Sequence, residues 1–238
     1  MEIIISLAIV VLAALTHASF QLSVSVLTLL RGHAIGAARS RARVIRLTAS
    51  YIAGAAVMIL LSLSTISLVL VHIFGAEVPL LVWAMGCGLA LGTGIAIWLF
   101  YYRRKRPGTE LWIPRSFADH LLRRSKATHH STEAFSLGMT SIVAEFLFFV
   151  PSALLAALAL LQLPGAWQLA GIGLYTGVSL LGLLIVWALV GSGRSIASIQ
   201  KWREDNKRFL QFAGGSALMV LAFFVYVNEV LAVVSGGY

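Results

Sequence analysis

Two ionisable residues, His17 and Glu145, lie deep inside apolar stretches of this 238-residue chain. Counting from the ends of the two stretches places each side chain near the middle of its stretch. An acid or a histidine at such a depth usually faces the interior of a helical bundle or a wet cavity, because facing lipid would leave it unsatisfied. A carboxylate near an imidazole can share a proton or hold a cation, so this pair is the first candidate for chemistry.

Polar side chains accompany both residues at helical spacing. Gln21 follows His17 by one turn, and Ser141 precedes Glu145 by one turn. Residues four apart lie on the same face of a helix, so the sequence predicts one substrate-binding or ion-binding site. Its members are His17, Gln21, Ser141 and Glu145. The alternative is that these polar groups serve only as packing contacts between helices.

Pro151 lies in the same apolar stretch as Glu145. Proline has no backbone N–H, so we expect an interrupted helix there, with a free carbonyl at about Leu147. Broken helices of this kind supply coordinating oxygens in transporters.

The elements that carry these residues follow from the distribution of charge. All eighteen Lys and Arg residues fall within 31–46, 103–126 and 194–208, and 59% of the chain is hydrophobic. A charge at the centre of a bilayer costs roughly 2.5–3.5 kcal/mol, so this confinement is typical of an all-α polytopic membrane protein. Six apolar runs are long enough to be transmembrane helices, at about 3–30, 47–73, 79–102, 134–161, 167–190 and 209–234.

The three basic windows follow the first, third and fifth apolar runs, so they lie on one side of the membrane. Short loops rich in Lys and Arg stay in the cytoplasm, which predicts that both termini face outside. The expected location is the plasma (inner) membrane of a prokaryote.

Three spans followed by three spans have opposite orientations, so the two halves are predicted to form an inverted repeat. We expect a single membrane domain over 1–238, made of a first three-helix repeat (1–102), a basic cytoplasmic loop (103–132) and a second three-helix repeat (133–238). Aligning the halves at an offset of about 128 residues superimposes the polar interruptions at His17 and Glu145.

Composition and motifs also argue against several kinds of protein. The net charge of +9 sits beside the spans, where anionic lipid explains it, so nucleic acid is not an expected partner. Cys87 is the single cysteine, so one chain can form neither a disulfide nor a two-thiol relay. The spans carry no HExxH, Ser-Lys or Ser-His arrangement, so neither an enzyme nor a cofactor is expected. The expected partners are the lipid bilayer and a small solute or ion, while a metal and a homo-oligomer stay open.

Three stretches resemble the LysE-type transporter superfamily. They are RLTASYIAG at 46–54, AFSLGMTSIVAE at 134–145, and the basic loop and apolar run over 201–221. This superfamily includes six-helix exporters of amino acids and metal ions, and also thiol-disulfide reductases of the DsbD and CcdA type. The likeness extends over nearly the whole chain.

The resemblance implies transport rather than redox chemistry. The reductases carry one cysteine in the first helix and one in the fourth, where this chain has His17 and Glu145 instead. The metal exporters carry acidic residues in those helices, a pattern that Glu145 matches and in which His17 takes the other position.

Two functions are compatible with the sequence. The first is a secondary transporter or exporter of a small solute or cation, with a midplane polar site between helices one and four. The second is a non-transporting membrane subunit or an assembly or scaffold protein, whose basic inner surface would be the working part.

Overall fold

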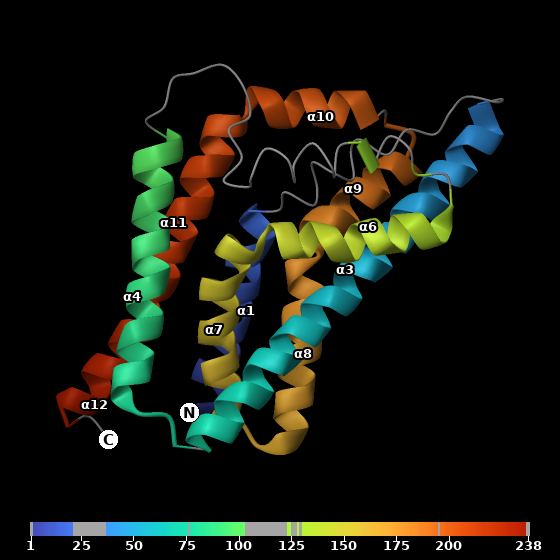
Figure 1. Cartoon of the computed structure of the whole chain (residues 1–238). Helices are drawn as coiled ribbons and strands as arrows, with labels where there is room; N and C mark the ends of the chain where they lie inside the picture. The colour runs from blue at the N-terminus through green and yellow to red at the C-terminus, as the bar shows by residue number, and fades with distance from the viewer. Residues whose placement is uncertain are drawn as a thin grey trace.

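The structure is a computed structural model of the whole chain, and it describes residues 2–20, 37–75, 77–102, 123–124, 128, 130–194 and 196–236. Regular structure in these residues is entirely helical (Figure 1). The elements are α1 (Glu2–Phe20), α3 (Ala37–Phe74), α4 (Leu80–Ile97), the π-helical turn η1 (Trp98–Tyr102), α6 (Ser131–Ala144), α7 (Phe146–Leu161), α8 (Gly165–Ser179), α9 (Leu181–Gly191), α10 (Ile196–Asp205), α11 (Lys207–Val225), the π-helical segment η2 (Tyr226–Leu231) and α12 (Ala232–Val234).

Three helical stretches are each long and apolar enough to cross a membrane: Ala42–Phe74, Leu80–Phe100 and Arg208–Val234. Two bent pairs raise the number to five if each pair is one span: α6 with α7, bent by 78°, and α8 with α9, bent by 49°. Within the described residues α1 is a shorter apolar helix, Ile3–Ser19.

The distribution of side chains is the one expected in lipid. Large apolar side chains such as Ile4, Leu169 and Phe223 are exposed, whereas His17 and Glu145 are buried. Exposed apolar side chains are stable in a bilayer, whereas an ionisable side chain facing lipid would lack hydrogen-bond partners. The sequence prediction of an all-helical integral membrane protein is confirmed at this level.

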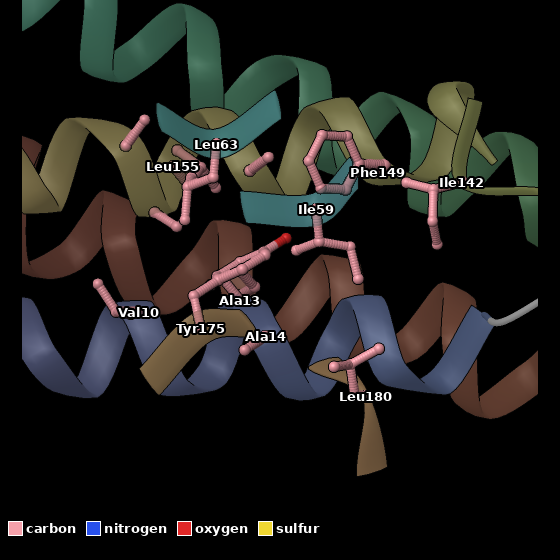
Figure 2. Packing of buried hydrophobic residues seen from close by; sticks show 14 of the residues in the cluster. Val10, Ala13, Ala14, Ile59, Leu63, Ile142, Phe149, Leu155, Tyr175 and Leu180 are labelled. Atoms are coloured by element: carbon pink, nitrogen blue, oxygen red, sulfur yellow. The ribbon is translucent and has the colours of Figure 1, made fainter. Parts of the chain in front are cut away.

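Helix α1 lies inside the bundle, where it contacts α7, α8 and α11. Helix α3 packs against α6, α7 and α8, and α4 packs against α7 and α11 (Figure 1). Buried apolar side chains fill the space between α1, α3, α7 and α8 (Figure 2). The elements that carry His17 and Glu145 therefore meet in the middle of the packed core.

The two ends of the bundle differ in charge. Helix α10 lies across one end, and α3 begins at the same end (Figure 1). Helix α3 carries four basic residues of the window at 31–46, and α10 carries Lys201 and Arg203 of the window at 194–208. Both ends of the chain lie at the opposite end of the bundle (Figure 1). The basic loop predicted over 103–132 lies mostly outside the described residues.

Two glycines set the crossing of α3 and α6. A Cβ atom added at Gly54 would meet the backbone oxygen of Phe135, and one added at Gly138 would meet the backbone oxygen of Tyr51. Small residues let two membrane helices approach until their backbones touch. This close crossing brings Tyr51 of α3 to the face of α6 that carries Ser141.

We expect Gly138→Ala to destabilise the protein, because the new methyl group meets backbone rather than a flexible side chain. Overpacking of this kind costs about 1–3 kcal/mol. Thermal unfolding of the detergent-solubilised protein measures the loss. Gly88→Ala is the matched control, since a Cβ atom there meets nothing within 4 Å. Equal melting temperatures for the two variants would contradict the described crossing.

Candidate functional site

The candidate site is built around a break between two helices. Helix α6 ends at Ala144, α7 begins at Phe146, and Glu145 joins them with φ −85° and ψ 4°. The Glu145 carbonyl accepts hydrogen bonds from the N–H groups of Phe148 and Phe149, at 2.8 and 2.9 Å. Glu145 is therefore the residue at which α7 starts, with its carboxylate beside the positive end of that helix.

The position of this break differs from the expectation. The sequence predicts an interruption at Pro151, whereas Pro151 lies inside α7 and the bend of 78° falls at Glu145. The helix continues through the proline although one backbone donor is missing. As a result, the ionisable side chain itself, rather than a carbonyl near Leu147, marks the broken point.

His17 of α1 lies opposite Glu145. His17 Nε2 and Glu145 Oε2 are 3.6 Å apart, and the two side chains are 0% and 1% exposed. Neither ring nitrogen of His17 has a hydrogen-bond partner among the described residues. Its polar contact in that part of the chain is thus the one with Glu145. The predicted pairing of the two deep ionisable residues is present in the structure.

Two aromatic rings enclose the imidazole. The ring of Phe149 meets the His17 ring edge-on, with centroids 5.0 Å apart, and the ring of Tyr175 from α8 stacks on it at 6.0 Å. The Tyr175 hydroxyl lies 3.4 Å from the Ser152 hydroxyl. All three of these side chains are fully buried. The rings therefore fix the plane of the imidazole and separate it from lipid.

Ser141 is also buried, one turn before Glu145 on α6. Its hydroxyl donates to the backbone oxygen of Gly138 at 2.7 Å. Its side chain also hydrogen-bonds with that of Tyr51, which approaches through the glycine crossing of α3 and α6. The sequence predicts Ser141 as a site residue, and the structure adds Tyr51 as its partner.

A positive charge acts on the site from the basic end. Arg203 of α10 is partly buried and interacts electrostatically with Glu145 and with Tyr51. Burial lowers the pKa of the Arg203 guanidinium, and the negative charge of Glu145 opposes that shift. Two basic groups therefore act on Glu145: His17 of α1 lies in contact with it, and Arg203 of α10 interacts with it electrostatically.

The structure brings together three of the four predicted site residues. His17 and Glu145 are in contact, and Ser141 lies one turn away, where its backbone oxygen accepts the N–H of Glu145 at 3.2 Å. The fourth, Gln21, lies outside the described residues. No group of three or more His, Cys, Asp or Glu side chains that could hold a metal ion occurs within the described ranges.

Four residues of the site were not among the predicted ones: Tyr51, Phe149, Tyr175 and Arg203. Three of them come from elements far along the chain from Glu145, so spacing within one helix gives no sign of them. Phe149 could have been predicted as a site residue, because it follows Glu145 by four residues and so lies on the same helical face. It was not predicted, because its neighbours in the sequence are also apolar and nothing sets it apart from them.

Comparisons with protein-family models, with curated proteins and with solved structures found no match to this chain. The function is therefore inferred from the geometry of the site. A carboxylate, an imidazole, a guanidinium and several hydroxyl groups can exchange a proton or hold a small charged group.

The buried pair predicts a strong energetic coupling. Removing one partner, as in Glu145→Leu or His17→Phe, leaves a polar group buried without its counterpart, which costs about 3–5 kcal/mol. The double variant His17→Phe/Glu145→Leu should lose much less than the sum of the two single losses. Unfolding free energies of the three variants in mixed micelles form a double-mutant cycle that measures this coupling. Strictly additive losses would contradict the contact.

Proposed function

We propose that this protein is a secondary transporter or exporter of a small solute or cation, and that the His17–Glu145 pair is its binding or coupling site. The observation that carries the proposal is an ionisable pair buried at the break of a helix. Ionisable residues inside membrane segments are costly, and they mark ion or substrate pathways more often than packing contacts.

The broken helix supports this function on its own. Transporter sites are commonly formed where a membrane helix is interrupted, because the half-helix ends present free backbone groups and partial charges to a ligand. Here α6 ends and α7 begins at Glu145, with a bend of 78°. A protein that only anchors a partner needs no interruption of this kind beside a buried acid–base pair.

The pattern of helix contacts supports the inverted repeat that we include in the proposal. Exchanging the halves replaces α1 with α6 and α7, α3 with α8 and α9, and α4 with α11. This exchange turns the contact between α3 and α7 into the contact between α8 and α1. It also turns the contact between α1 and α11 into the contact between α7 and α4. All four contacts are present. Six spans with both termini outside are the arrangement that this symmetry favours.

The charge of the two ends supports an orientation. Basic residues beside spans remain in the cytoplasm, so we assign the end that carries α10 to the cytoplasmic side of a plasma (inner) membrane. The resemblance to LysE-type exporters belongs to the same proposal, since these proteins combine six helices with polar residues in helices one and four.

Transport in proteoliposomes tests the proposal. The probes are labelled amino acids and the cations Mn²⁺, Ca²⁺ and Na⁺, each supplied against an imposed pH gradient. We expect uptake or extrusion of at least one probe, and we expect Glu145→Gln to abolish it, because the neutral amide can neither carry a negative charge nor exchange a proton.

Glu77→Gln is the control variant. Glu77 is an exposed acid in the connection between α3 and α4, so its loss should leave the flux unchanged. A flux that is the same in Glu145→Gln and in the wild type would contradict the role of the pair. No flux with any probe, combined with capture of a partner protein that depends on Arg203, would favour a scaffold instead.

A further inference from the structure

A second set of hydrogen-bonded polar side chains lies away from the candidate site. The hydroxyl of Ser6 donates to Gln162 Oε1 at 3.2 Å, and Gln162 Nε2 donates to Glu229 Oε2 at 2.8 Å. These residues belong to three separate elements: α1, the C-cap of α7 and η2. This polar set therefore ties three segments together at the end of the bundle where both chain ends lie (Figure 1).

This polar set shares one face of α1 with the candidate site. Ser6 and His17 are eleven residues apart, which is about three helical turns and about 16 Å. Val10 and Ala13 lie between them on the same face and are fully buried against the apolar part of α7 (Figure 2). The two polar groups thus lie at opposite ends of a dry layer.

The surroundings of Glu229 suit a group that gains and loses a proton. Its side chain is partly buried and Gln162 is exposed, so the hydrogen bond between them lies at the surface of the protein. Glu229 lies in the π-helical segment η2, and such segments occur often at functional sites. Cys87 of α4 faces the carboxylate closely enough to interact with it electrostatically. Ser6, Gln162 and Cys87 are among the polar or titratable groups around this carboxylate, which has at least one further interaction.

We propose that Glu229 is a second proton-binding carboxylate of the transport path and that, while ionised, it keeps this end of the bundle closed through Gln162. The inference rests on the proposed transport function. A hydronium ion at this end gives its proton to a Glu229 oxygen and leaves as water. The neutral carboxyl accepts the Gln162 N–H more weakly than the carboxylate does, so η2 can separate from α1 and α7. Loss of the proton to water restores the closed form.

Cys87 is a native probe of this step, because it is the single cysteine of the chain, is buried, and lies beside Glu229. The experiment measures the rate at which a maleimide labels Cys87 in the full-length protein in proteoliposomes, from about pH 8 to about pH 5, a range that approaches the ordinary pKa of a glutamate. The labelling rate of Cys87 is divided by the rate for a cysteine peptide at the same pH. This ratio corrects for the intrinsic change of thiol reactivity with pH.

The wild-type ratio should rise several-fold as the pH falls. Glu229→Gln should give a ratio that does not change with pH, because the amide does not titrate. Gln162→Leu should give a high ratio at every pH, because the donor is gone. Glu77→Gln should behave as the wild type. A flat wild-type ratio, or a wild-type rise that persists in Glu229→Gln, would overturn the proposal.

The same readout separates this inference from the proposed transport function. Glu145→Gln should keep the wild-type dependence of Cys87 labelling on pH while it abolishes flux. Absence of flux with an intact labelling profile counts against transport but not against the proton site at Glu229. Loss of the profile in Glu145→Gln would assign the titrating group to Glu145 and overturn the inference.

Discussion

The contact between His17 and Glu145 is the interaction on which the rest of the structure depends. A carboxylate buried in an apolar bundle costs several kcal/mol unless an oppositely charged or hydrogen-bonding partner offsets the loss of water. Here the partner is His17, which comes from another helix, α1. This requirement fixes how α1 packs against the break, with small residues such as Ala13 and Ala14 allowing the helices to approach.

The neighbouring elements adapt to that pair in different ways. The glycine crossing of α3 and α6 admits Tyr51, which hydrogen-bonds with Ser141, and α8 supplies Tyr175 as a stacking surface for the imidazole. Arg203 of α10 interacts electrostatically with the same carboxylate. One acid with two basic neighbours on different elements can change its partner when those elements move.

The general fold and the centre of the site could be predicted from the sequence. Charges confined to short windows and long apolar runs reflect the cost of inserting charge into lipid, and the same cost makes His17 and Glu145 conspicuous. The break could not be placed correctly, because Pro151 is the usual signal for an interrupted helix, whereas the conformation of Glu145 is set by packing. Tyr51, Tyr175 and Arg203 reach the site through contacts between distant elements, and a single sequence does not record such contacts.

Accessibility of the site from the two sides of the membrane tests the central claim most directly. The chain has one cysteine, so Cys87→Ser gives a cysteine-free background into which Ser141→Cys can be placed. A transport site should react with a membrane-impermeant thiol reagent in right-side-out and in inside-out vesicles, with the balance between the two sides shifting when Glu145 is also replaced by Gln. No reaction from either side would show a sealed structural pair and would contradict the account.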